Sequence, residues 1–243
     1  MRGRVAHGAR LALTALLLTT ASGCASLAKP SPVSLGMAQV MNDRRATVTS
    51  AAALTEIRID GLEKLQAPFP ATFTATLRHT APDQFEVDAY GPMGLLLFSY
   101  STTADSWLLR SPGQPPAGGP LAANGRAPAT LLLDTLAHLL DGVLGVPLHG
   151  APPRRTKDGG WRTARDGVRF HMVDGNLARI AFKRHGVGKV AIAYSDYRPV
   201  AGTTFPREAP HAIVLTVPRH QVTMTVQVAE WAVQSAPAGY FAP

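Results

Sequence analysis

The sequence predicts a mainly β domain with helices (α+β), built on a single large, curved antiparallel sheet of about eleven strands. Apolar and polar residues alternate along most of the chain after residue 71, which is typical of strands with one buried face. Short turn sequences separate the alternating segments, for example Pro82-Asp83 and Asp174-Gly175-Asn176, and such turns join antiparallel neighbours. A Leu-rich segment at residues 130–144 breaks the alternation and predicts one helix inserted in mid-chain.

The N-terminus predicts a bacterial lipoprotein signal peptide over residues 1–23. Three arginines precede the apolar run Leu11–Thr20, which has about half of the roughly 20 residues needed to span a bilayer. Three small residues then lead to Cys24, as in a lipobox. We therefore expect Cys24 to carry a covalent diacylglycerol and an N-acyl chain, with no other cofactor. The alternative is an ordinary secretory signal followed by a free cysteine.

The lipid anchor predicts where the protein works. Each acyl CH₂ group buried in a bilayer contributes ~0.8 kcal/mol, so two or three acyl chains hold a protein on the membrane. Ala25 stands where Asp would be the usual inner-membrane retention signal, which indicates the periplasmic face of the outer membrane. Removing the signal peptide lowers the formal charge from +8 to about +5. The remaining basic residues form no stripe interleaved with aromatic residues, so nucleic acid is not expected as a partner.

The mature chain predicts one domain between two flexible ends. Residues 24–36, rich in Ala, Ser and Pro, predict a tether between the lipid and the domain. The domain spans residues 37–233, begins with a short helix from about Met37 to Ala53, and is expected to be a monomer. Residues 234–243 form a C-terminal tail. Since Cys24 is the only cysteine, no disulfide or cysteine nucleophile is expected in the domain.

The period of two predicts which residues of the strands face inward. The Gly/Pro/Ala-rich residues 111–128 do not follow this period and predict a long loop. The residues expected to face inward are Phe73, Ala75 and Leu77; Phe85, Val87 and Ala89; Ile180 and Phe182; Val190, Ile192 and Tyr194; Ile213, Leu215 and Val217; and Val222, Met224, Val226 and Val228.

The Leu-rich helix is predicted to be amphipathic. Pro128 near its start and Gly142 just past its end are typical boundary residues. Because such a sheet buries one face, the helix is expected to cover the concave face. Its apolar stripe suits either core packing or the wall of a lipid cavity. The stripe consists of Leu132, Leu136, Leu139, Leu140 and Val143, while Asp134, His138 and Asp141 lie off it.

No motif predicts catalysis or metal binding. The sequence contains neither Gly-x-Ser-x-Gly nor His-Glu-x-x-His, and its histidines are spread one per strand or loop. The few acidic residues do not lie in aromatic runs suited to sugars. We therefore expect a protein that is not an enzyme and holds no metal.

Surplus hydrophobicity marks one turn and the strand after it. Gly91-Pro92-Met93-Gly94 predicts a tight turn between strands with Met93 at its tip. An apolar side chain there either contacts a membrane or partner, or folds back onto the sheet. Leu95 to Phe98 are apolar on both faces. That suits a central strand covered on both sides, or a strand with one face on the core and one on a bound acyl chain.

These features resemble the LolA and LolB families, and LolB-like proteins most of all. Residues 91–94 are similar to that family's Asn/Gly-Pro-Leu-Gly turn, in which the third residue protrudes and is needed to pass lipoproteins into the membrane; here it is Met93. Tyr194-Ser195-Asp196-Tyr197 resembles its Tyr-x-x-Tyr turn, and the strand ending at Trp231 resembles its closing strand. The resemblance covers residues 37–233 and implies a half-open β-barrel with a helical lid over an apolar cavity.

The resemblance implies an outer-membrane lipoprotein that binds acyl chains or lipoproteins and helps insert them into the membrane. A periplasmic lipoprotein carrier would be its partner. The alternative is a non-catalytic structural or assembly lipoprotein that binds a protein of the cell envelope. In the first case Pro92, Met93 and Leu95 would contact the membrane, and the cavity would be lined by Leu96, Phe98, Leu132, Leu136, Leu139 and Leu140.

Overall fold

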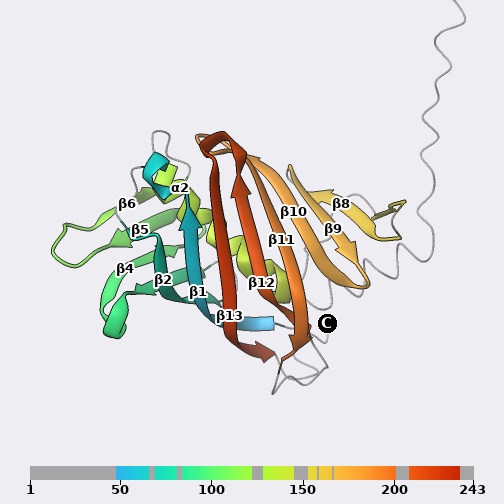
Figure 1. The fold of residues 1–243 in the computed structure, drawn as a ribbon, viewed down its shortest axis with the longest axis horizontal. Coiled ribbons are helices and arrows are strands. Elements are labelled where there is room, and N and C mark those ends of the chain that lie inside the picture. Colours follow the sequence, from blue (N-terminus) through green and yellow to red (C-terminus); the bar gives the residue numbers. More distant parts are fainter. Residues whose placement is uncertain are drawn as a thin grey trace, which may run out of the picture. The chain divides into compact units, whose positions relative to one another are not determined.

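The computed structural model describes residues 48–65, 69–80, 84–121, 128–144, 153–157, 159–165, 167–200 and 208–235 (Figure 1). The chain divides into two units, Met1–Ser31 and Pro32–Pro243, and all described residues belong to the second. The predicted signal peptide, Cys24 and the tether lie outside the described residues, so these remain predictions. None of the helices within the described ranges is long and apolar enough to cross a membrane.

A single antiparallel sheet forms the body of the domain, as predicted. The described residues contribute thirteen strands to it, where the sequence predicted about eleven. Two meanders, β1 to β6 and β7 to β13, meet where β1 pairs with β13, and the sheet stays open with β6 and β7 at its edges. The strands are β1 (Val48–Asp60), β2 (Thr72–Thr80), β3 (Gln84–Tyr90), β4 (Leu96–Thr102), β5 (Ser106–Arg110), β6 (Ala117–Pro120), β7 (Arg154–Arg155), β8 (Trp161–Arg165), β9 (Val168–Val173), β10 (Asn176–Arg184), β11 (Gly188–Pro199), β12 (Glu208–Val217) and β13 (Val222–Ser235).

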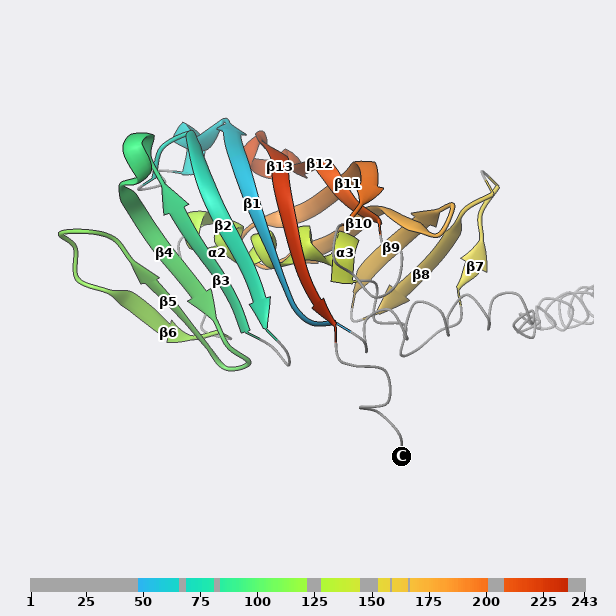
Figure 2. The ribbon, with the colours of Figure 1, turned by 90° about the horizontal axis from the view of Figure 1, so that it is seen from below.

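A helical segment is confirmed where the sequence predicted the Leu-rich helix, and it lies across the strands on one face of the curved sheet (Figure 2). It has three parts, α2 (Pro128–Thr135), η3 (Leu136–Leu140) and α3 (Asp141–Leu144), which together contact β1, β2, β10 and β12. Gly142, which was expected just past the end of the helix, lies inside this segment. Three single 3₁₀ turns complete the described structure: η1 (Leu62–Leu65), η2 (Pro92–Gly94) and η4 (Pro218–His220).

The core lies between this helical segment and the sheet. The six predicted strand segments bury the residues that their alternation placed inward, from Phe73, Ala75 and Leu77 in β2 to Met224 and Val226 in β13. The alternation of β13 shifts by one residue at a bulge opposite Leu54 and Thr55, and the shift turns Trp231 inward. Its indole Nε1 donates a hydrogen bond to the carbonyl of Pro210 at 3.0 Å.

The predicted helix from Met37 to Ala53 is wrong over residues 48–53, which form the start of β1. From Ala51 onward, every second residue of β1 is buried through Ile59, which is the period of a strand. The strand pairs with β13 on one side and β2 on the other. Two hydrogen-bonded neighbours therefore override the helix propensity of the alanine-rich stretch.

The predicted loop over residues 111–128 is also partly wrong. Residues 117–120 form β6, which pairs with β5 and extends the sheet by one strand. The strand carries two glycines and a proline, Gly118, Gly119 and Pro120, which weaken a strand signal. Proline is tolerated there because β6 lies at the edge of the sheet.

One glycine sets how closely the helical segment approaches the sheet. A Cβ atom on Gly142 of α3 would lie 2.6 Å from Cγ of Pro210 in β12 and 3.0 Å from Cδ1 of Tyr194 in β11. Because backbone and proline ring cannot give way easily, any side chain at this position would push α3 off the sheet.

We expect Gly142→Ala to destabilise the protein by about 1–3 kcal/mol through this overpacking. Urea unfolding at equilibrium measures the change. Gly119→Ala is the matched control, because the nearest atom to a Cβ there lies 3.9 Å away. Equal effects of the two substitutions would contradict the argument.

Candidate functional site

The β3–β4 turn presents Met93 at its tip, where the sequence placed it. The amide of Gly91 donates to the carbonyl of Leu95 at 2.8 Å, and the amide of Gly94 donates to Gly91 at 3.2 Å. Pro92 opens the turn, and Met93 sits in the left-handed backbone region with φ 61° and ψ 20°. Its side chain is 93% exposed, so it does not fold back onto the sheet.

The conformation of Met93 is unfavourable twice over. A non-glycine residue in the left-handed region costs roughly 1–2 kcal/mol, and exposed apolar surface gains nothing from burial. The following Gly94, with φ 72°, takes the same region without that penalty. The packing of the domain therefore gives no reason for methionine at this position.

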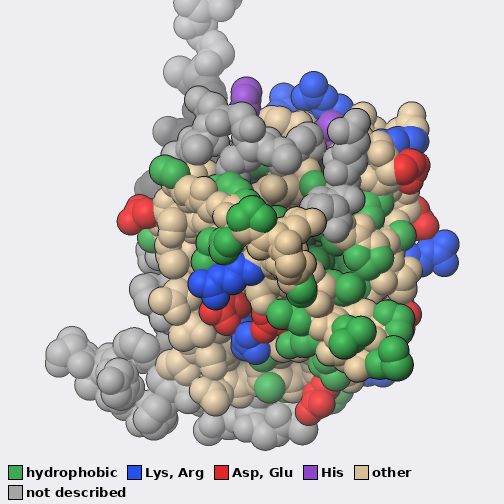
Figure 3. Space-filling model, turned by 90° about the vertical axis from the view of Figure 1, so that its left-hand side faces the viewer, with side chains coloured by type: hydrophobic (Ala, Val, Ile, Leu, Met, Phe, Trp, Pro, Cys, Tyr) green, Lys and Arg blue, Asp and Glu red, His purple; other side chains and the backbone are tan. Residues whose placement is uncertain are grey.

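Two more apolar side chains continue this exposed surface along the chain. Leu95 is 63% exposed and Leu96 is 43% exposed. Figure 3 looks onto the side formed by β4 to β6 and shows hydrophobic side chains gathered on its surface. Pro92, Met93, Leu95 and Leu96 are called the apolar tip below. The expectation that Leu95 and Leu96 belong to a strand covered on both faces is wrong, because both side chains are solvent-accessible.

A cluster of buried aromatic rings anchors the strand that follows the apolar tip. Phe98, two residues into the core from Leu96, is 2% exposed and packs against Phe69 and Phe73, with ring centroids 5.1 and 5.6 Å apart. Edge-to-face and tilted aromatic pairs of this kind are favourable beyond their buried area. Phe98 is thus anchored in the core, while the apolar tip that precedes it in the chain remains exposed.

The four leucines predicted to line a cavity are core residues in this structure. Leu132, Leu136, Leu139 and Leu140 are each at most 1% exposed, in the core between the helical segment and the sheet. Phe98 is buried in the same core, whereas Leu96 lies outside it. Of the two readings of the apolar stripe, core packing is what the described residues display.

Asp134 of α2 is a buried carboxylate that the sequence placed off the apolar stripe. It is 6% exposed. The hydroxyl of Tyr100 in β4 donates to one carboxylate oxygen, and the guanidinium of Arg184 in β10 pairs with the other. Burial raises the pKa of Asp134 to about 6, against the lowering effect of Arg184. The three residues tie the helix to both halves of the sheet.

A second polar group ties the other end of the helical segment to β11. Nδ1 of His138 lies 2.8 Å from Oδ2 of Asp141, and the hydroxyl of Tyr194 donates to the carbonyl of His138. The His138 ring also packs on Phe182, with ring centroids 4.7 Å apart. Burial and the charge of Asp141 raise the pKa of Tyr194 well above its usual value, so its hydroxyl stays protonated and donates.

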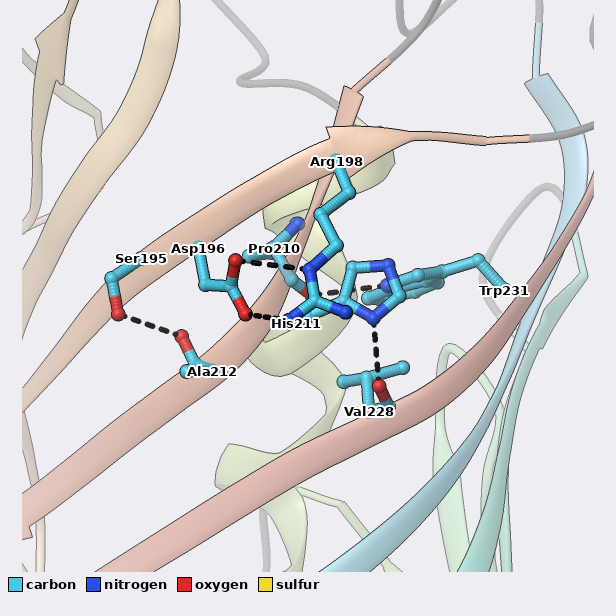
Figure 4. A network of polar contacts seen from close by, with 8 residues as sticks. All are labelled: Ser195, Asp196, Arg198, Pro210, His211, Ala212, Val228 and Trp231. Atoms are coloured by element: carbon cyan, nitrogen blue, oxygen red, sulfur yellow. Dashed lines mark hydrogen bonds and ion pairs between the residues drawn. The ribbon is translucent and has the colours of Figure 1, made fainter.

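Asp196 and Arg198 of β11 lie close to His211 of β12 and Trp231 of β13, where these three neighbouring strands run side by side (Figure 4). Asp196, with φ 55°, pairs with Arg198 in two contacts, the longer of them 3.0 Å. This hydrogen bonding lowers the pKa of Asp196. Nδ1 of His211 lies 2.8 Å from the carbonyl of Val228. These contacts lie within β11 and join β12 to β13. None of them aligns a nucleophile with a base.

Metal ligands do not cluster in the part of the chain that the structure describes: no three His, Cys, Asp or Glu side chains there come close enough to share an ion. The polar contacts described above join the helical segment to the sheet through Asp134 and through the carbonyl of His138. The apolar tip is therefore the surface with the clearest functional character.

No family model matches the sequence, and no curated protein matches it. Among solved structures, an outer membrane lipoprotein-sorting protein domain from Vibrio parahaemolyticus is similar, with a TM-score of 0.50 and 11% sequence identity over 82% of this chain and 92% of that one. The two share a fold. The large antiparallel sheet that the resemblance implied is thus shared with a solved lipoprotein-sorting domain.

Other solved structures cover similar shares of the chain. A LolA superfamily protein from Nitrosomonas europaea gives a TM-score of 0.45 and 11% identity, over 86% of this chain and 97% of that one. LprF from Mycobacterium bovis gives 0.32 and 14% identity, over 83% and 94%.

Met93→Gly is expected to stabilise the protein by about 1 kcal/mol, because glycine takes the left-handed region without strain. Leu95→Gly is the matched control on the same exposed turn. Leu95 has φ −69°, so glycine there relieves nothing and should destabilise slightly. Urea midpoints compare the two, and a loss of stability in Met93→Gly would contradict the strain argument.

The raised pKa of Asp134 predicts that stability falls as pH rises. Below its ordinary pKa of 3.8 the side chain is protonated in both the folded and unfolded states. Between pH 4 and 6 the folded state binds the proton more tightly, so its stabilising contribution is lost as pH rises through about 6. We expect Asp134→Asn to reduce the pH 4 to pH 7 loss of stability by about 2–3 kcal/mol.

Urea unfolding at pH 4 and pH 7 measures this difference. Asp196→Asn is the control: this carboxylate is exposed, and pairing with Arg198 lowers its pKa, so its contribution has the opposite sign. The explanation fails if Asp134→Asn keeps the pH dependence of the wild type.

Proposed function

We propose that this chain is an envelope lipoprotein that binds acyl chains, free or attached to lipoproteins, and passes them to a membrane through the apolar tip. The exposure of Met93 in a strained backbone carries this proposal, because neither folding nor packing accounts for it. The shared fold with a lipoprotein-sorting domain supports it. Anchoring of Cys24 at the periplasmic face of the outer membrane is part of the proposal.

The energetics of acyl chains explain why such a protein is needed. The three acyl chains of a lipoprotein contain about 45 CH₂ groups, and at ~0.8 kcal/mol each their exposure to water costs roughly 30 kcal/mol or more. A chain in transit must therefore stay buried. The large apolar surface available for this lies between the helical segment and the sheet, where Leu132, Leu136 and Leu139 are packed in the core.

Binding there requires the helical segment to move away from the sheet. Two sets of polar contacts hold it: Tyr100 and Arg184 on Asp134, and Tyr194 on the His138 carbonyl. The acyl chain would replace leucine contacts with its own, so the apolar cost of opening is largely offset. The site must hold the chain less tightly than the bilayer does, which leaves the membrane as the final acceptor.

The apolar tip would make the contact with the bilayer. A lipid anchor on Cys24 keeps the domain close to the membrane, so that even a weak contact through Met93 and Leu95 is made often. A periplasmic lipoprotein carrier would be the source of the cargo.

We expect Met93→Gln to slow the transfer of a fluorescent fatty acid from the protein to phospholipid vesicles at least about fivefold. The substitution replaces an apolar side chain of this size with a polar one, which loses most of the 1.5–3 kcal/mol that its burial in a bilayer contributes. Leu54→Gln is the matched control, since Leu54 is 42% exposed but lies in the middle of β1. Stopped-flow fluorescence measures the rates.

Lipid that co-purifies with the protein, identified by mass spectrometry, tests the binding half of the proposal. Absence of both co-purifying lipid and fatty-acid uptake overturns the proposal. Equal rates for the two glutamine variants overturn the role of the tip. Binding of a cell-envelope protein without any lipid binding would favour the alternative, a structural or assembly lipoprotein.

A further inference from the structure

Arginines gather on the face of the sheet that the helical segment leaves uncovered. Phe170, Met172 and Ile180 point into the core from β9 and β10. Their neighbours along the chain therefore point to the opposite face. Arg162, Arg169 and Arg179 are exposed there, on β8, β9 and β10, which lie side by side at the right of Figure 1.

The strand register places these side chains in one group. Arg162 pairs directly with His171, and His171 pairs with Arg179 on its other side. Arg162 and Arg179 thus flank the imidazole at roughly 10 Å from each other, the width of two strand spacings. Arg169 lies one step along the same face of β9. The four side chains, with Ala181 and Phe170, line a shallow pocket of about 260 Å³.

No acidic residue is among the described residues that line this pocket. None of the ion pairs between described residues involves Arg162, Arg169 or Arg179. Arg162 and Arg179 both face His171 and Arg169 faces alanines, so the three guanidinium groups share one face of the sheet with no described carboxylate between them.

The other half of the same face shows the usual arrangement. There a smaller pocket of about 160 Å³ contains Arg78 together with Glu86 and Asp88. Nε of Arg78 lies 3.3 Å from Oε2 of Glu86, and its guanidinium also pairs with Asp88. Its charge is neutralised within the protein, whereas no described carboxylate pairs with Arg162, Arg169 or Arg179.

We propose that Arg162, His171, Arg179 and Arg169 form a binding site for a phosphate group, either on a phospholipid headgroup or free in solution. Guanidinium groups match phosphate oxygens two at a time through their planar N–H donors. Two arginines 10 Å apart can reach a single phosphate held over the histidine between them. The negative charge of the bound phosphate would also neutralise part of the positive charge of this group. This site lies on the face opposite the buried leucines and is independent of acyl-chain binding.

The test is isothermal titration of the full-length protein in maltoside micelles, which contain no phosphate. Inorganic phosphate is one probe and short-chain dihexanoyl phosphatidylglycerol is the other, both at constant ionic strength so that general screening is matched. We expect the double variant Arg162→Gln/Arg179→Gln to bind at least about tenfold more weakly than the wild type, because each removes a charge-assisted pair. Arg78→Gln is the matched control and should bind as the wild type does.

The two probes distinguish the source of the phosphate. Binding of inorganic phosphate assigns the site to a free phosphate group, and binding of phosphatidylglycerol alone assigns it to a headgroup. The proposal is overturned if neither probe binds, if the double variant binds unchanged, or if Arg78→Gln weakens binding equally. Should the double variant not fold, Arg169→Gln must weaken binding severalfold. Met93→Gln should leave this binding intact even if it abolishes lipid transfer.

Discussion

The pairing of β1 with β13 holds the domain together. Each of the two strands begins or ends a meander, and only their ladder makes one sheet of the two. The contact is far from local, since Ala53 lies opposite Trp231. It is secured by burial on the inner face, where the helical segment contacts β1 on one side of this seam and β12 on the other. The buried leucines of the helical segment therefore add to the hydrogen bonds of the β1–β13 ladder in holding the two meanders together.

Polar contacts then fix how the helical segment sits. An apolar stripe alone would let the segment rotate or slide, because leucine contacts are not directional. Asp134 binds Tyr100 from one meander and Arg184 from the other. Burial raises the pKa of this carboxylate, so its contribution to stability is expected to be smaller at neutral pH than in acid. A segment held by a few directional bonds over an apolar core can also be released, which the proposed carrier function requires.

Two separate surfaces have features that do not contribute to folding stability. The apolar tip exposes Met93 in a strained conformation, and the uncovered face aligns Arg162, His171 and Arg179 without a described carboxylate. Each has a counterexample within the same sheet: Gly94 shows how the turn avoids strain, and Arg78 shows how an arginine is neutralised. Features of this kind are expected where a surface has a partner, because selection for binding tolerates a local cost.

The sequence by itself determined the strands with a clean period of two, the Leu-rich helix and a tight turn with Met93 at its tip, but not whether Met93 protrudes. Those signals are local: alternation, a helical stripe, and glycines flanking a proline. Tertiary structure decided the rest. Residues 48–53 became a strand because partners approached on both sides, and residues 117–120 became one because β5 offered a free edge. Asp134 is buried against Tyr100 and Arg184, which lie 34 and 50 residues away in the chain, so no local pattern could predict its burial. The arginine group exists only through strand register, and register depends on pairings that no local pattern encodes.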